Sequence, residues 1–373
     1  MDTTIRTIEI PIRVWPHLLA PAATLLLFAL PPFPHRRLVH LTTFITLSLL
    51  SLQAPMPPLP AEQVAPWPRL TLALALVWMH HLGWLAKMLL HRPEHDFWRV
   101  GRPDHEAESF HGAGLGRAKT AWALSLLASP RGVGWNFGVA GLRPRGRLVG
   151  RWRFVAGQVL RTVVFGGVEG VVEGVLCRGE HAALEGWRRV VLEPVVAGRV
   201  WLDVEVLYAC CNAVLVAGGL AEEKDCLPLF GNNITRLDSL REFWGQLWPQ
   251  TFRVMFEDFG HYVCWCLGIH RRTRLSRVVQ VCTSFLISGA AHAFAMSACA
   301  GPGSTPFRAV FGFFILQAVG LTIEDLALDA PIRDLTLYEV GLEDEMIMGR
   351  IWTFGWLWFS FYWVVHVYLP SSC

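Results

Sequence analysis

The sequence has few charged residues. They make up 17% of its 373 residues, whereas ~25% is usual in a soluble domain. The hydrophobic share is 53%, with 17 tryptophans and a mean hydropathy of +0.37. The formal net charge of +3 is too small to indicate a nucleic-acid partner. The composition therefore predicts a polytopic membrane protein whose main surroundings are the lipid bilayer.

Motifs of several other protein classes are missing. The nine cysteines form no CxxC pair and no repeating spacing, so neither a disulfide scaffold nor a zinc site is predicted. The chain contains no G-x-S-x-G nucleophile motif and no GxxxxGK[ST] phosphate loop. It shows no internal repeat. The first apolar stretch lacks a clear cleavage site and is interpreted as a membrane span, not as a signal peptide.

Long apolar runs dominate the chain. A helix needs roughly 20 apolar residues to cross a bilayer, and runs of this length are too long for barrel strands. We therefore expect an all-α fold, with residues 1–373 forming a single multi-spanning domain of about eight transmembrane helices. Segment 251–269 is expected to be re-entrant or interfacial, because it contains several ionisable side chains. The apolar runs lie near residues 12–30, 38–54, 69–90, 154–176, 197–219, 251–269, 278–300, 307–328 and 351–369, and the ionisable side chains are Arg253, Glu257, Asp258 and His261.

Arginine carries almost all of the positive charge and gathers between the apolar runs. The clusters are Arg36 and Arg37, the arginines from 131 to 153, and those from 271 to 277. The positive-inside rule places all of these clusters in the cytosol and both termini on the far side. Asn233 begins a glycosylation sequon, but this topology would keep it in the cytosol and unmodified. An integral, multi-pass protein of the endoplasmic reticulum is expected.

A polar stretch, residues 91–118, follows the third apolar run. His91 and His95 form an HxxxH pair, which on a helix can hold a metal ion. Pro93 lies between them and disfavours a continuous helix. The further histidine boxes of a membrane di-iron oxygenase are absent, so a solvated loop and no metal site are expected. Residues 177–196 are also mixed in charge and are expected to form a loop with an interfacial helix.

One ionisable residue lies inside the apolar run Val281–Met296. This residue, His292, follows the small residues Ser288–Ala291, which would let a helix or a substrate approach closely. An imidazole in the middle of a span is costly and usually faces a cavity or a partner. Its position is also consistent with a histidine that is simply hydrogen-bonded inside a helix bundle.

Residues 237–250 combine polar and aromatic side chains. Phe243 and Leu247, like Trp244 and Trp248, are four residues apart, which is helical spacing. Pro249 would end or kink the helix. The pattern predicts an amphipathic helix, which on its own would lie in the membrane interface. Asp238 or Ser239 is expected to cap its start, with Glu242 placed as in a capping box.

The same stretch resembles a known family. Leu240-Arg241-Glu242-Phe243-Trp244-Gly245, with Trp248 and Gln250, is similar to the S-L-R-x-F-W-G-x-x-W-H-Q signature of wax-synthase-like membrane-bound O-acyltransferases. Ser288-Gly289-Ala290-Ala291-His292 resembles their S-G-x-x-H pattern. Phe314, Gln317, Ala318, Gly320, Glu324 and Asp325 resemble their F-x-x-Q-A-x-G-x-x-x-E-D pattern. Arg131-Gly132-Val133-Gly134 and Arg350–Trp356 look like the filamentous-fungal branch, whose members acetylate secondary metabolites. The resemblance covers about residues 90–373.

The resemblance implies acyl transfer from acyl-CoA, acetyl-CoA first, to a hydroxyl of a hydrophobic alcohol such as a terpenoid. Acyl-CoA would be a co-substrate, with no bound cofactor. His292 would act as the base, and Gln250 and Trp248 would donate hydrogen bonds to the oxyanion. Arg241, Arg271 and Arg272 could meet the CoA phosphates at the cytosolic mouth, or could simply be arginines that face the cytosol under the positive-inside rule. The expected substrate-binding residues are Arg241, Phe243, Trp244, Ser288, Gly289, Gln317 and Glu324.

One position departs from the family pattern, and other functions stay open. Pro249 stands where the family usually has His or, in other branches, Asn. Either the position is dispensable, or Gln250 or His261 substitutes, or activity is impaired. A long-chain wax ester synthase and a non-enzymatic transporter or scaffold are alternatives. A terpene cyclase would use Glu324 and Asp325 as its acid, but the tryptophan-rich stretch would then have no role.

Overall fold

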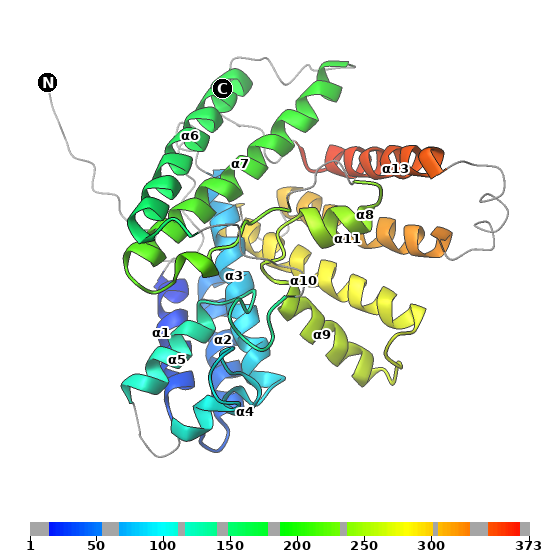
Figure 1. Ribbon diagram of the computed structural model, residues 1–373. Helices are drawn as coiled ribbons and strands as arrows, with labels where there is room; N and C mark the ends of the chain where they lie inside the picture. Colours follow the sequence, from blue (N-terminus) through cyan, green and yellow to red (C-terminus); the bar gives the residue numbers. More distant parts are fainter. Residues whose placement is uncertain are drawn as a thin grey trace, which may run out of the picture.

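The computed structural model describes residues 15–53, 67–110, 116–139, 148–177, 187–231, 237–300, 305–328 and 342–365. These ranges are mostly helical and contain no β-strand, only an isolated bridge between Arg99 and Trp135. The expected all-α fold is therefore confirmed (Figure 1). Asn233 lies outside the described residues, as do the ends of the first and last expected runs.

The long helices each overlap one of the expected apolar runs. They are α1 (Trp15–Ala29), α2 (Arg36–Gln53), α3 (Trp67–Leu89), α6 (Arg151–Cys177), α7 (Trp187–Ala217), α9 (Arg253–Cys266), α10 (Arg274–Ala300), α11 (Thr305–Leu328) and α13 (Leu342–Tyr362). Shorter elements join them: α4 (Pro93–Asp96), the 3₁₀ turn η3 (Glu106–Phe110), α5 (Arg117–Leu127), the 3₁₀ turn η5 (Glu223–Asp225), α8 (Leu240–Glu242) and the π-helical turn η6 (Phe243–Leu247).

Five helices in the described part of the chain are long and apolar enough to cross a membrane. They confirm a polytopic protein, while the total of eight crossings stays a prediction. Helix α9 has 14 residues and is therefore ~21 Å long, shorter than the ~30 Å hydrocarbon core. This length agrees with a segment that does not cross. The five candidate spans are Thr71–Leu89, Arg151–Gly174, Leu192–Ala217, Arg274–Met296 and Phe307–Leu326.

Two parts of the chain are more helical than expected. Helix α7 already begins at Trp187, so residues 187–196 extend a span instead of forming a separate interfacial helix, and Pro194 lies inside it. Helix α5 matches none of the expected runs, because it has only 11 residues and includes Arg117 and Lys119. Trp122 and Leu126 are fully buried in a core cluster with Phe28 of α1 and Met88 of α3.

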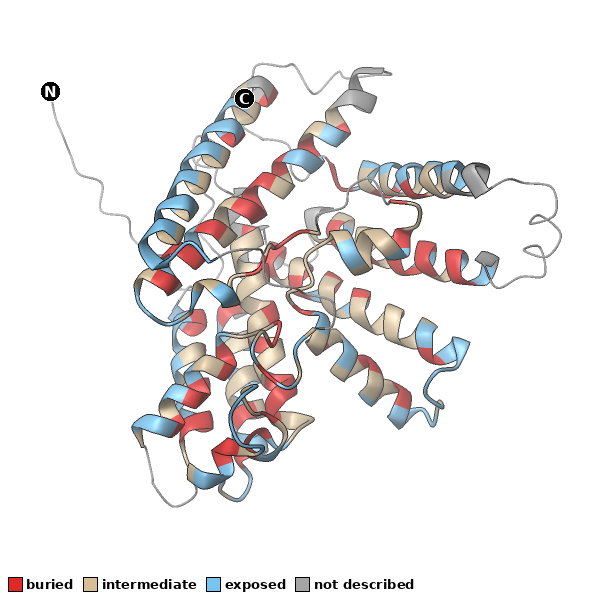
Figure 2. Cartoon of the chain, viewed as in Figure 1, coloured by how far each residue is buried: buried red, intermediate tan, exposed pale blue. Residues whose placement is uncertain are grey.

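The helices form three groups around the central pair α3 and α10. Helices α1, α2 and α5 pack beside α3, helices α6 and α7 lie against each other, and α9, α11 and α13 fan out around α10 (Figure 1). Helices α3 and α10 pack together at a core cluster that includes Met79 and Ala291. Helix α6 has many exposed apolar residues, as expected of a face that meets lipid (Figure 2).

A buried ion cluster holds the first group together. The Arg36 guanidinium donates two hydrogen bonds to the Glu94 carboxylate, at 2.6 and 2.7 Å. Lys119 Nζ lies 3.2 Å from the same carboxylate and donates to the backbone carbonyl of Leu30 at 2.6 Å. Helices α2, α4 and α5 are thereby linked through one buried carboxylate that pairs with two cations.

Candidate active site

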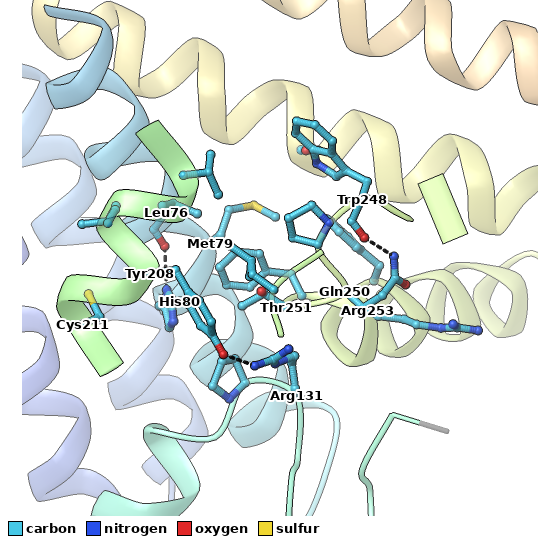
Figure 3. Close-up of a pocket in the computed structure, with 18 of the residues that line it drawn as sticks. Leu76, Met79, His80, Arg131, Tyr208, Cys211, Trp248, Gln250, Thr251 and Arg253 are labelled. Carbon is cyan, nitrogen blue, oxygen red and sulfur yellow. Dashed lines mark hydrogen bonds between the residues drawn. The ribbon is translucent and has the colours of Figure 1, made fainter. Parts of the chain in front are cut away.

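A cavity of about 1990 Å³ opens between α3, α7, α10, α11, α13 and the turn formed by α8 and η6. It is larger than the ~300–1,000 Å³ of typical small-molecule sites. Its wall is mostly apolar and aromatic, with a few polar side chains, some of which Figure 3 shows. The cavity therefore has room for more than one hydrophobic ligand.

The turn that closes one side of the cavity begins with a well-defined cap. The Ser239 hydroxyl accepts from the backbone N–H of Glu242 at 3.1 Å, and the Glu242 carboxylate accepts from the backbone N–H of Asp238. The expected cap is therefore present. The Glu324 carboxylate of α11 adds hydrogen bonds from the backbone N–H groups of Leu240 (2.7 Å) and Arg241 (3.1 Å). These N–H groups lie in the first turn of a helix, where they have no intrahelical partner.

After one α-helical turn the backbone widens. The N–H of Trp248 bonds to the carbonyl of Phe243, five residues earlier, at 2.8 Å. The predicted α-helical stripe is therefore wrong beyond Glu242, because the chain continues as a π-helical turn up to Leu247. Such turns are frequent at functional sites. Gln250 ties off the turn, since its amide donates to the carbonyls of Trp244 (2.9 Å) and Trp248 (2.7 Å).

His292 lines the cavity from α10. Its Nδ1 lies 2.9 Å from the backbone carbonyl of Ser288, and its ring packs on Phe314 with centroids 4.6 Å apart. A carbonyl oxygen can only accept, so Nδ1 carries the proton of the neutral ring and Nε2 keeps its lone pair. Nε2 has no hydrogen-bond partner among the described residues. The helix backbone thus orients a basic nitrogen that remains available to a ligand.

The two expected oxyanion donors differ in their availability. Both N–H groups of the Gln250 amide already bond to backbone carbonyls. The Trp248 indole lines the cavity, and its N–H has no partner within the described ranges. His261, considered as a substitute for the residue that Pro249 replaces, does not line the cavity, whereas Pro249 does.

The expected substrate-binding residues divide into two groups. Arg241, Phe243, Trp244 and Ser288 line the cavity, and Gly289, Gln317 and Glu324 do not. Gln317 is fully buried and accepts from the Trp244 indole N–H at 3.2 Å, so it fixes a wall residue from behind. A Cβ at Gly289 would lie 3.1 Å from Cβ of Phe314, so this glycine lets α10 and α11 approach closely.

The arginines expected at the CoA phosphates lie elsewhere. Arg271 and Arg272 are exposed on the turn between α9 and α10 and are not part of the cavity wall. Arg241 does line the cavity, but it forms an ion pair with Asp325.

Polar residues outside the expected set also face the cavity. His80 of α3 repeats the arrangement of His292, with Nδ1 2.8 Å from the carbonyl of Leu76. Arg131 and Tyr208 lie at the same side of the cavity (Figure 3). The adjacent pair His80-His81 stands out in the sequence, but it does not show which of the two histidines faces the cavity. His81 stacks on His17 instead, with centroids 5.8 Å apart.

The histidines of the polar stretch do not form the HxxxH arrangement. His91 Nε2 lies 3.1 Å from Asp258, whereas His95 Nδ1 lies 2.9 Å from Asp96. Donor atoms of His95, His105 and Glu108 lie within 4.8 Å of one another and could hold a metal ion. These residues are largely exposed and lie outside the cavity wall.

Comparisons with known proteins identify relatives. The model of the membrane bound O-acyl transferase family matches residues 226–316. Acetyltransferase sirH of Emericella nidulans is 27% identical over 65% of this chain and 58% of its own length. Acetyltransferase aurG of Calcarisporium arbuscula is 27% identical over 65% of this chain and 64% of its own length. Acetyltransferase eriL of Hericium erinaceus is 26% identical over 64% of this chain and 63% of its own length. No solved structure matches.

The chain spans about three fifths of the length of these curated relatives. The family match covers the turn with Trp244 and Trp248 and reaches His292, so it contains the residues that bring a basic nitrogen to the cavity. Residues 226–316 therefore match the membrane bound O-acyl transferase family, and about two thirds of the chain is similar to proteins named acetyltransferases.

Proposed function

We propose that this protein transfers an acyl group, acetyl in the first instance, from acyl-CoA to a hydroxyl of a hydrophobic acceptor. The observation that carries the proposal is His292, whose Nε2 lone pair faces a large apolar cavity with its tautomer set by Ser288. Relatives named acetyltransferases support the acetyl donor. A relative named aspirochlorine biosynthesis protein F supports a secondary-metabolite acceptor, and a terpenoid would suit the apolar wall.

The reaction needs a base because an alcohol is a weak nucleophile at neutral pH. His292 Nε2 takes the hydroxyl proton as the oxygen attacks the thioester carbonyl, which typically contributes about 10²–10⁴-fold. The carbonyl oxygen becomes an oxyanion, and the unpartnered Trp248 indole N–H is the donor available to it; one such donor is worth ~2.7–4 kcal/mol. Collapse of the tetrahedral intermediate releases the CoA thiolate, which takes the proton back from the imidazolium.

The size of the cavity supports direct transfer between two bound substrates. About 1990 Å³ exceeds the space that one small ligand fills. Both substrates can therefore be held together, and their alignment supplies the proximity that an acyl-enzyme would otherwise provide. Acyl-CoA is then a co-substrate and no bound cofactor takes part. An integral location in the endoplasmic reticulum, with the donor entering from the cytosol, would suit this chemistry.

The test is alcohol-dependent release of free CoA by purified protein with acetyl-CoA and a panel of terpenoid and long-chain alcohols. His292→Ala should lower the rate per folded molecule by about 10²–10⁴-fold. His270→Ala, which alters an exposed histidine outside the cavity wall, should leave it unchanged.

Full activity in His292→Ala would refute the assignment of the base. Wax esters as the main product would refute the proposed acceptor. No release with any donor or alcohol would favour a transporter or scaffold.

A further inference from the structure

Arg131 is a buried cation in the wall of the cavity. Arg131 is only 6% exposed, and it lines the cavity. Nη1 donates to the carbonyl of Pro228 at 2.8 Å, and Nη2 donates to the carbonyl of Leu227 at 2.9 Å and to the hydroxyl of Tyr208. Figure 3 shows the guanidinium reaching from its loop to Tyr208. All of these partners are neutral.

The charge of Arg131 has no counterpart in the described residues. No carboxylate there lies within ion-pair distance of it. Four other cationic residues of the cavity wall do have one: Arg99 pairs with Glu106, Lys224 with Glu222, Arg241 with Asp325, and Arg253 with Glu257. A buried charge without a partner is strongly unfavourable, which indicates that an anion completes this site.

The guanidinium also has donors to spare. It carries five N–H groups, and its bonds to Pro228, Leu227 and Tyr208 use three of them. The Nε–H and one Nη1–H have no partner among the described residues. The carboxylates on the adjacent turn η5 do not compete for them, because Glu223 accepts from the backbone of Val149 and Gly150. Asp225 accepts from the backbone of Glu222.

The loop that carries Arg131 is hydrogen-bonded to a neighbouring loop that brings a second arginine to the same wall. Gly132 and Gly134 have φ angles of +63° and +76°, which side-chain-bearing residues rarely adopt. The carbonyl of Gly134 accepts from the backbone N–H of Val100 at 2.8 Å, which fixes the neighbouring loop. Arg102 on that loop also lines the cavity, is exposed, and has no ion pair within the described part of the chain.

We propose that Arg131 forms an anion subsite that binds a phosphate of the acyl-CoA donor, with Arg102 at its outer edge. This inference rests on the proposed function, in which CoA is the substrate that carries phosphates. A guanidinium with free N–H groups suits a phosphate, because each can donate a charge-assisted hydrogen bond to a phosphate oxygen. The donor would then lie with its phosphates at Arg131 and its thioester toward His292, which lines the same cavity.

Calorimetric binding to the detergent-solubilised protein tests this without any turnover. Arg131→Gln should weaken CoA binding about 10- to 100-fold, the scale of a lost charge-assisted contact, and should leave binding of pantetheine, which has no phosphate, unchanged. Arg131→Lys keeps the charge and should show a smaller loss of the same selectivity. Arg253→Gln is the matched control, because this arginine lines the same cavity but is already paired with Glu257.

A competition experiment on the wild-type protein does not depend on whether a variant folds. Inorganic pyrophosphate should compete with CoA for binding. Wild-type CoA affinity in Arg131→Gln, an equal loss for pantetheine, or no competition by pyrophosphate would overturn the proposal. Retained CoA affinity with loss of co-purifying phosphatidylglycerol would assign the subsite to a lipid phosphate instead. Selective CoA binding without any acyl transfer would uphold the subsite and refute the proposed function.

Discussion

Glu324 offers a clear test of how the aromatic turn is built. The resemblance to the family implies that it binds substrate, whereas the structure places it behind the cavity wall. Its carboxylate accepts from the backbone N–H groups of Leu240 and Arg241, and from the Trp352 indole N–H at 3.2 Å. Glu324 is 6% exposed, so these donors cannot turn to water if the carboxylate is lost.

The expected loss of stability follows from these contacts. A hydrogen bond to a charged group is worth ~1.5–3 kcal/mol. Glu324→Ala removes both backbone contacts and should cost ~3–6 kcal/mol. Glu324→Gln keeps one carbonyl oxygen but turns an NH₂ group toward a backbone N–H, which should cost ~1–3 kcal/mol. Glu242→Gln is the matched control; its contact to the N–H of Asp238 is only half-buried, and its cost should stay below ~1 kcal/mol.

Thermal unfolding in detergent, followed by size-exclusion chromatography, gives the order of stability of these variants. Glu324→Ala should melt lowest, Glu324→Gln should melt between it and the wild type, and Glu242→Gln should melt near the wild type. The transfer rate per folded molecule of Glu324→Gln should change little. A variant that melts like the wild type but has a greatly raised KM for either substrate would refute the structural role and restore the substrate contact.

Further predictions concern the ion cluster and the ends of the turn. Burial raises the pKa of Glu94, but the hydrogen bonds and charge of Arg36 outweigh burial and bring the pKa below the usual 4.5. The ionised Glu94 therefore stabilises the folded state above pH 4.5, and this stabilisation is lost as the pH falls through the folded-state pKa. Denaturation at several pH values should show this loss, and Glu94→Gln should flatten the slope. Gly231→Ala would bring a Cβ to 2.3 Å from the carbonyl of Gln246, so a melting temperature equal to that of the wild type would contradict the close packing. Pro249→His should preserve or raise turnover with a small acyl donor if the family histidine assists. It should lower activity on the native acceptor if proline shapes the end of the helix.

The sequence predicted most of the long helices, because the apolar runs are long enough to be recognised as helical segments. It could not assign partners. Glu324 and Gln317 stand in a recognisable pattern, but residue type and spacing do not reveal whether a side chain faces a ligand or a neighbouring helix. In the structure they hold Leu240 and Trp244 in place. The side chains that support the site were therefore interpreted as residues that contact the substrate.

The π-helical turn and the cavity face of α3 were missed for geometric reasons. Aromatic residues four apart predict an α-helix. The sequence does not show that the N–H of Trp248 bonds to the carbonyl of Phe243, five residues earlier. His80 and His81 are adjacent on a helix and therefore point ~100° apart. Which of them meets the cavity depends on how α3 packs, and the sequence does not contain that rotation. The sequence likewise gave no reason to separate Arg131 from the arginines that face the cytosol.

The carbonyl that orients His292 comes from the helix that carries it. Every residue of a helix has a carbonyl four positions earlier, so this orientation would survive at any position along α10. The rotation of α10 about its own axis decides whether His292 faces the substrate. Inserting a residue early in α10 would turn His292 by ~100° and remove it from the cavity, although its Nδ1 would remain bonded. Gly289 packs closely against Phe314 and therefore opposes such a rotation. The ability of His292 to act as a base thus depends on how α10 packs against α11, and not on a charged neighbour.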